Sequence, residues 1–127
     1  MIKDKVYFNV LTDQVASCAY LVGRNLGPGF LEKVYEKAMA IELTDIGLSV
    51  ETQKHIPVSY KGQIIGEYFA DMLVEGEIIL ELKAVKSIEN IHFAQCQNYL
   101  KATGKKLGLL INFGEEKVKV RRVANGI

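Results

Sequence analysis

Apolar residues recur along the first part of the chain with the spacing of a helix. Over residues 6–22 they return at three- to five-residue steps, which predicts one face of an amphipathic helix. The residues expected on its buried face are Val6, Val10, Val15, Ala19 and Val22. The glycines within residues 23–27 are expected to break this helix.

A second helix is predicted over residues 28–46. Pro28 suits the first helical position, and Gly47 is a natural C-terminal stop. The residues expected to be buried are Leu31, Val34, Tyr35, Ala38 and Ile41.

The period changes to two after Gly47. Residues 49–60, 63–74 and 77–85 are rich in Val, Ile and Tyr, and the dipeptides Lys61-Gly62 and Glu75-Gly76 separate them. This pattern predicts three antiparallel strands joined by two hairpins.

The last third of the chain predicts one helix and two strands. The helix is expected from Ser87, a plausible N-cap, to Thr103, with Gly104 as its stop. Residues 107–113 predict a buried strand and residues 118–123 a more polar one. The order is therefore ααβββαββ, an α/β (α+β) chain with a mixed sheet flanked by helices in a single domain over residues 1–127.

Composition limits the class of protein. The 127 residues are 49% apolar, as in an ordinary globular domain, and no run of eighteen apolar residues predicts a membrane span. No signal-peptide pattern is found, so a cytoplasmic protein is expected. Cys18 and Cys96 fall in predicted helices without metal-ligand spacing and are expected to be reduced core thiols.

A net charge of +1 excludes a strongly basic nucleic-acid binder, so any phosphate affinity must be local. One candidate cluster is Lys101, Lys105 and Lys106, and the other is Lys117, Lys119 and Arg121, which alternate along the last strand. A solvated face that keeps the protein soluble explains these residues equally well.

The segment from Asp71 to Lys83 carries the most informative charges. Glu81 and Lys83 are two residues apart on an otherwise apolar strand, so both side chains project from the same face. Burying a carboxylate and an ammonium costs several kcal/mol each unless they are paired or bind a metal. The two residues therefore either partner each other or form a site.

The hairpin turn decides whether Asp71 joins them. A two-residue loop at Glu75-Gly76 puts Asp71 opposite Leu80, on the wrong face. A three-residue loop over residues 74–76 puts it opposite Ile79 and diagonal to Glu81, so that the carboxylates converge. The same register places Glu67 opposite Lys83, and a Glu67–Lys83 ion pair with Asp71 at a solvated edge is the structural alternative.

An Asp followed ten residues later by Glu-x-Lys on a hairpin resembles the signature of the PD-(D/E)XK nuclease superfamily. More narrowly, Gly29-Phe-Leu-Glu-Lys-Val-Tyr35 resembles the Gly-x-x-Glu-x-x-Tyr motif of the GxxExxY protein family. Five blocks along the chain carry this resemblance, over residues 26–35, 66–71, 81–84, 95–100 and 109–114.

The resemblance implies a metal-dependent phosphodiesterase core. Asp71 and Glu81 would bind Mg²⁺ or Mn²⁺, the carbonyl of Leu82 would add a ligand, and Lys83 would orient or help to deprotonate the attacking water. These residue types agree with the chemistry, because Mg²⁺ prefers oxygen ligands and an ammonium stabilises charge on a phosphoryl group.

The resemblance also assigns residues on the helices. Glu32 would reach the metal, directly or through water, and Tyr35, on the same helix face, is a candidate substrate contact. Gln95 and Tyr99, one turn apart, would order the site or contact the nucleic-acid backbone. The alternatives are that Glu32 only favours the positive end of its helix, and that Gln95 bonds internally while Ile91, Tyr99 and Ala102 pack. His55 and His92 have no ligand-spaced partner.

The sequence therefore predicts a Mg²⁺-dependent nuclease acting on DNA or RNA, with nucleic acid as its partner and no membrane association. A homodimer could cradle a duplex. The alternatives are a catalytically inactive module that binds nucleic acid or protein on the same fold, and a structural protein whose carboxylates only form ion pairs.

Overall fold

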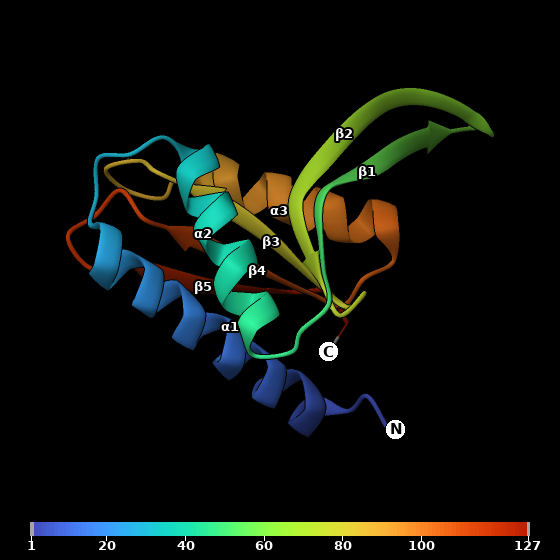
Figure 1. Ribbon diagram of the computed structural model, residues 1–127. Helices are drawn as coiled ribbons and strands as arrows, with labels where there is room; N and C mark the ends of the chain where they lie inside the picture. Colours follow the sequence, from blue (N-terminus) through green and yellow to red (C-terminus); the bar gives the residue numbers. More distant parts are fainter. Residues whose placement is uncertain (1, 127) are drawn as a thin grey trace.

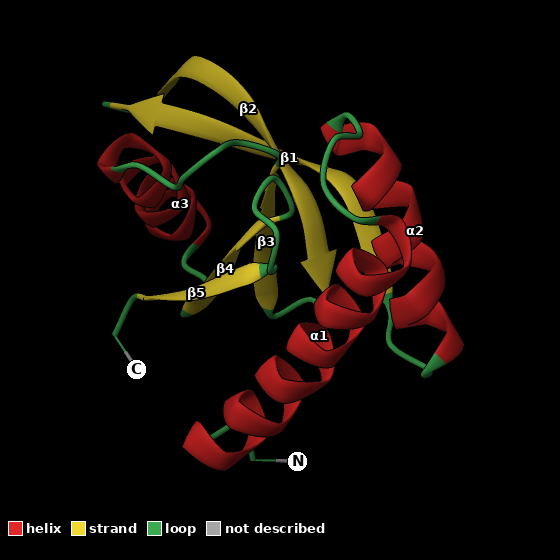
Figure 2. Ribbon diagram, turned by 90° about the vertical axis from the view of Figure 1, so that its left-hand side faces the viewer, coloured by secondary structure: helices red, strands yellow, loops and turns green. Residues whose placement is uncertain are grey.

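A five-stranded mixed sheet separates the helices into two layers (Figures 1 and 2). The computed structural model describes residues 2–126. Helices α1 (Lys5–Leu26) and α2 (Glu32–Asp45) cover one face of the sheet, and α3 (Asn90–Thr103) covers the other. The strands are β1 (Val50–Tyr60), β2 (Gln63–Val74), β3 (Ile78–Lys83), β4 (Leu107–Asn112) and β5 (Lys119–Ala124). The predicted order ααβββαββ and the α+β class are confirmed.

The sheet order is β1-β2-β3-β4-β5, and β3 pairs with β4 in parallel while the other neighbours are antiparallel. Helix α3 makes the crossover between the two parallel strands, as a parallel pair requires. Every residue of β4 is buried, and in β3 only Lys83 is partly exposed. Glu81 therefore lies in the buried centre of the sheet, and Lys83 lies at the partly exposed end of its strand.

The hairpin of β1 and β2 leaves the sheet. Strand β2 pairs with β3 only from Met72 to Val74, whereas it pairs with β1 almost to the hairpin turn. Gln53, at a φ of 52°, interrupts the β1–β2 ladder where the hairpin bends. We call residues 54–70 the arm, and Figure 1 shows it standing away from the rest of the sheet.

The buried face of α1 was wrongly predicted in its first half. Val6 and Val10 are 67% and 54% exposed, and the helix continues through Gly23 to end at Gly27. The buried residues are Phe8, Leu11, Val15, Cys18, Ala19 and Val22. Gly23 packs closely inside this helix, and a Cβ at this position would collide with the Val118 side chain.

Two further helix starts differ from the prediction. Helix α2 begins at Glu32 rather than Pro28, because Gly27 and Gly29 take positive φ angles and keep the preceding loop extended. Leu31, Val34 and Ile41 are consequently exposed, and the buried face is Tyr35, Glu36, Met39 and Leu43. Helix α3 begins at Asn90, where Glu89 and His92 form a capping box, and not at Ser87.

The expectation for the two cysteines agrees with the structure. Cys18 and Cys96 are buried free thiols. None of the helices among residues 2–126 has both the length and the apolar character that crossing a bilayer requires.

Candidate active site

Asp71 and Glu81 meet in the fork where β2 separates from β3. The Asp71 main-chain N–H donates a hydrogen bond to Glu81 Oε2 at 2.9 Å. The Leu82 N–H donates to Asp71 Oδ2 at 2.7 Å. Each carboxylate thus binds a main-chain donor on the opposite strand, at the point where the strand ladder stops. The two side chains converge as predicted, although the sequence did not predict these hydrogen bonds.

The turn that sets this register is one residue further along than predicted. Val74 pairs with Ile78, so the loop is Glu75-Gly76-Glu77 and not residues 74–76. Glu75 and Gly76 both have positive φ angles, and the Glu77 N–H donates to the Val74 carbonyl at 2.9 Å. The shift brings Asp71 level with Glu81 rather than opposite Ile79.

The alternative ion pair between Glu67 and Lys83 is also wrong. Glu67 lies on the arm, and its carboxylate contacts His55 Nε2 at 2.9 Å. Lys83 points toward α3, where its Nζ donates to Gln95 Oε1 at 3.5 Å.

Burial dominates the electrostatics of the carboxylate pair. Glu81 is only 4% exposed, and burial together with the charge of Asp71 raises the pKa of Glu81 to about 8. Burial also raises the pKa of Asp71, and Glu36 and Glu32 act in the same direction. The nearby Lys83 opposes both shifts but does not cancel them. A bound cation would favour the ionised form of both residues.

We expect the metal-free protein to lose stability as the pH rises from about 4.5 to about 8. An unfolded glutamate loses its proton near 4.5, whereas Glu81 in the folded protein retains it up to about 8. The folded state therefore binds more protons across this range, and stability falls with rising pH. The difference between the two pKa values sets an upper limit of roughly 5 kcal/mol. A fall of only roughly 1–2 kcal/mol would already lower Tm by roughly 5 °C.

Thermal unfolding in EDTA at the two ends of that range measures this effect. Saturating Mg²⁺ should remove most of the loss of stability at high pH, because the ion binds only the ionised carboxylates of the folded protein. A Tm that rises across the range in EDTA would contradict the assignment of buried, proton-binding carboxylates.

An amide on α3 holds Lys83. Gln95 accepts from Lys83 through Oε1 and donates through Nε2 to the Tyr99 hydroxyl at 3.1 Å. Gln95 and Tyr99 thus connect the site lysine to α3. The alternative for this helix is found in part. Gln95 bonds internally and Tyr99 is 6% exposed, whereas Ile91, which is 67% exposed, and Ala102 do not pack.

Helix α2 closes the other side of the fork. A small cavity of about 90 Å³ is lined by Glu32, Lys33, Glu36, Gln53, Asp71 and Leu82. Glu32 is exposed, whereas Glu36 is 7% exposed and accepts from Lys33 Nζ at 2.9 Å and Gln53 Nε2 at 2.6 Å. Sequence reasoning missed Glu36, although its position one turn after Glu32 places it on the same helix face.

Tyr35 does not face this cavity. Its side chain is 0% exposed, stacks on Phe113 with ring centroids 4.5 Å apart, and donates its hydroxyl to the Gly27 carbonyl at 2.6 Å. A substrate cannot reach it, so its role in the structure is to hold the loop that precedes α2.

The donor set fits Mg²⁺ or Mn²⁺ in chemistry. Among residues 2–126, no three His, Cys, Asp or Glu side chains gather closely enough to enclose an ion. Asp71 and Glu81 provide two carboxylates, each with one oxygen committed to a main-chain N–H. Mg²⁺ is commonly bound by one or two carboxylates and retains several waters, so a pair is sufficient.

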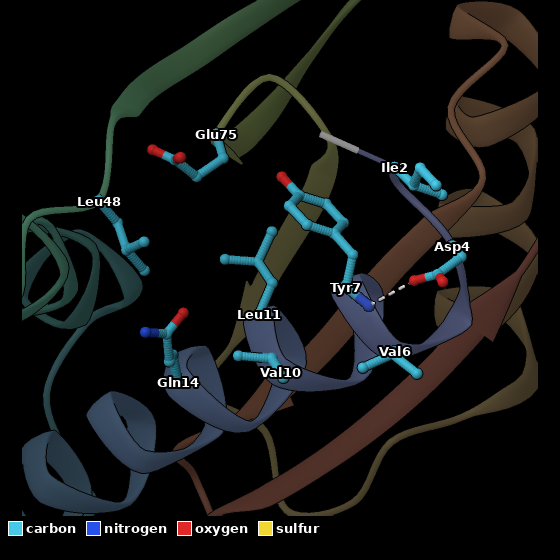
Figure 3. Close-up of a pocket in the computed structure, with 9 residues that line it drawn as sticks. All are labelled: Ile2, Asp4, Val6, Tyr7, Val10, Leu11, Gln14, Leu48 and Glu75. Carbon is cyan, nitrogen blue, oxygen red and sulfur yellow. Dashed lines mark hydrogen bonds between the residues drawn. The ribbon is translucent and has the colours of Figure 1, made fainter.

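A roomier hollow lies at the N-terminal half of α1 (Figure 3). It measures about 530 Å³ and is lined mainly by apolar residues, among them Val6, Val10, Leu11 and Leu48. It has two carboxylates with separate partners: Asp4 accepts from the Tyr7 N–H and caps the helix, and Glu75 accepts from the Ser49 N–H at 2.6 Å. The hollow therefore lacks the converging charged groups found in the fork.

Comparison with known proteins agrees with the geometry. The chain matches the PD-(D/E)XK nuclease superfamily over residues 9–123. A search of the curated proteins found no match.

Two solved structures share the fold. One is an alkaline exonuclease (LHK-Exo) from Laribacter hongkongensis, with a TM-score of 0.55 and 14% identity over 98% of this chain and 72% of that one. The other is SSO0001, with a TM-score of 0.52 and 16% identity over 96% of this chain and 61% of that one. The fold agrees with the sequence match, and this chain belongs to the PD-(D/E)XK nuclease superfamily.

Proposed function

We propose that this chain is a metal-dependent nuclease that hydrolyses phosphodiester bonds of DNA or RNA, with Asp71, Glu81 and Lys83 in its active site. The observation that carries the proposal is the pair of carboxylates in the fork, the buried Glu81 and the half-buried Asp71, which are bonded to each other's strands and have raised pKa values. Strongly perturbed carboxylates beside a lysine are typical of active sites. The superfamily membership supports the same reading.

Asp71 and Glu81 would hold Mg²⁺ or Mn²⁺, together with the Leu82 carbonyl and with Glu32 at the exposed edge. A bound ion would lower the pKa of a coordinated water and offset charge on the phosphate. Lys83 is held beside the carboxylates by Gln95, so its ammonium would orient the attacking water or stabilise the developing negative charge. Gln95 and Tyr99 would keep the lysine in place or contact the substrate backbone.

Calorimetric titration of Mg²⁺ and Mn²⁺ tests the metal site. The wild-type protein is expected to bind the ion, and the variant Asp71→Asn, which keeps an oxygen acceptor for the Leu82 N–H, is expected to bind it at least tenfold more weakly. Asp71→Asn should also cleave labelled DNA and RNA more slowly than the wild type. Equal metal binding by both proteins would remove Asp71 from the site.

The competing proposal is a catalytically inactive module that binds nucleic acid or protein on the same fold. The two-carboxylate set and the net charge of +1 are compatible with it. Tight binding of nucleic acid at low salt with no turnover in either metal would favour this alternative. The nuclease proposal has nucleic acid as its partner, whereas the inactive module would bind nucleic acid or protein. In both proposals the protein works in the cytoplasm without a membrane, and a homodimer could enlarge the binding surface.

A further inference from the structure

A second hollow adjoins the candidate active site on the side of α3. It measures about 390 Å³ and lies between the arm and the helix. Its walls include Val58 and Tyr68 from the arm and Ile91, Ala94, Gln95 and Tyr99 from the helix. Figures 1 and 2 both show the arm extending past α3, so the two elements flank this space.

The walls present aromatic and aliphatic surface to solvent. Tyr68 is 49% exposed on the arm, and Ile91 is 67% exposed on the helix. Tyr68 lies beside Tyr99, with ring centroids 6.0 Å apart. Tyr99 is only 6% exposed, so Tyr68 is the ring that is open to solvent. An exposed aromatic ring provides a stacking surface for a nucleobase, and stacking does not depend on base identity.

Polar groups of the hollow are amides and an imidazole. Gln95, Asn98 and His92 belong to its lining, and the lining residues include no carboxylate. Amides can both donate to and accept from the edges of a base, and a lining without carboxylates does not repel the phosphates on either side. The chemistry suits a flat heterocycle with a polar edge.

Gln95 joins the hollow to the active site. Its amide lines the hollow and also bonds Lys83 Nζ at 3.5 Å. A base that enters the hollow would therefore belong to a nucleotide next to the phosphate held at Asp71 and Glu81. A base in a duplex is stacked on both faces and paired along its edge, so only an unpaired base could enter without an unstacking cost.

We propose that the hollow between the arm and α3 binds an unpaired nucleobase next to the cleaved phosphodiester, which makes single-stranded or frayed nucleic acid the preferred substrate. This inference rests on the proposed nuclease function. Tyr68 is the stacking residue, and Gln95 couples the bound base to Lys83.

Fluorescence anisotropy in metal-free, low-salt buffer tests the base site. The probes are a labelled single-stranded oligonucleotide, the same strand in a duplex, and versions with one abasic position moved along the strand. Tyr68→Ala is compared with Tyr68→Phe, which keeps the ring, and with Tyr60→Ala. Tyr60 is a matched control, because it is 61% exposed on the same arm and is not part of the lining.

Wild-type protein is expected to bind the single strand more tightly than the duplex. Tyr68→Ala should weaken single-strand binding roughly tenfold, whereas Tyr68→Phe and Tyr60→Ala should retain it. One abasic position should cost the wild type a similar factor and cost Tyr68→Ala nothing more. Equal affinity for single strand and duplex, or unchanged binding by Tyr68→Ala, would overturn the inference.

Cleavage in Mg²⁺ separates the two proposals. If the wild type cleaves and Tyr68→Ala leaves both affinity and KM for the single strand unchanged, the base site is wrong and the nuclease proposal stands. If single strands bind in a Tyr68-dependent manner without cleavage in Mg²⁺ or Mn²⁺, the nuclease proposal is wrong and the base site stands.

Discussion

Replacing Glu81 with glutamine is expected to lower metal-dependent cleavage by roughly a thousandfold or more, since a charge that positions the metal and its water is lost. Glutamine has nearly the same shape and keeps an oxygen that can accept the Asp71 N–H. The substitution therefore removes the charge while preserving the contact between β2 and β3. Single-turnover cleavage of a labelled oligonucleotide in Mg²⁺ measures the loss.

The same variant should be at least as stable as the wild type in EDTA at the alkaline end of the pH range. Glu81 is 4% exposed and ionises at this alkaline pH without a bound cation. Replacing it with glutamine therefore removes the free-energy cost of burying a charge. Glu67→Gln is the matched control, because its side chain is 64% exposed on the arm, and it should cleave normally. Normal cleavage by Glu81→Gln would exclude Glu81 from the active site.

This opposition between activity and stability separates a catalytic carboxylate from a structural one. A carboxylate that served only as an acceptor for the Asp71 N–H would be replaced by glutamine with little change in either property. If the buried charge of the carboxylate holds a cation, the glutamine variant should instead lose activity without losing stability, because the charge is unfavourable when no cation is bound. Measuring both properties in one variant therefore tests function independently of folding.

The order of elements was predictable because its signals are local. Alternating residues and the dipeptides Lys61-Gly62 and Glu75-Gly76 predicted the hairpins, and both turns have positive φ angles. The helix faces were harder. Val6 and Val10 fit a helical spacing as well as Phe8, Leu11 and Val15 do, and only the position of the sheet decides which set is buried.

The candidate site was predictable as a set of residue types and not as a geometry. The spacing of Asp71, Glu81 and Lys83 indicated convergence, but the register depended on whether Glu77 belongs to the turn or to the strand. The loop lies one residue further along than predicted, which moves the partner of Asp71 by two residues, from Ile79 to Glu81, and a shift of two residues keeps the same face of a strand. Asp71 and Glu81 still meet because they lie level with each other where the ladder has opened, and each bonds the opposite main chain.

The narrower resemblance to the GxxExxY family stays a prediction, but two of its residues now have structural positions. Glu32 lines the cavity in the fork, and Tyr35 is buried beneath the loop that leads to it. The motif therefore contains one residue at the candidate site, Glu32, and one that supports the neighbouring loop, Tyr35. A linear motif does not distinguish these two roles, because both residues lie near one helix face.

The segment after Lys83 is fixed to the end of β4 by a buried amide. Asn112 is 0% exposed, and its side chain bonds both the N–H and the carbonyl of Val85, at 3.0 and 2.9 Å. The same Asn112 Oδ1 accepts from the Gly114 N–H at 3.0 Å. The main chain of Ala84 and Val85 therefore lies directly against Gly114.

Gly114→Ala is expected to destabilise the protein by roughly 3 kcal/mol or more, because the new Cβ would meet the main-chain atoms of Ala84 and Val85, which cannot rotate away as a side chain can. Gly62→Ala is the control: its Cβ meets nothing within 4 Å, so its cost of roughly 1 kcal/mol is only that of alanine at a positive φ. Urea unfolding of both variants measures the difference. Equal losses of stability would mean that the two segments do not lie this close.

A larger loss of stability for Gly114→Ala, with reduced cleavage in the molecules that still fold, would have a second meaning. It would indicate that the close contact beyond β4 holds Lys83 in place, because Ala84 and Val85 follow Lys83 directly.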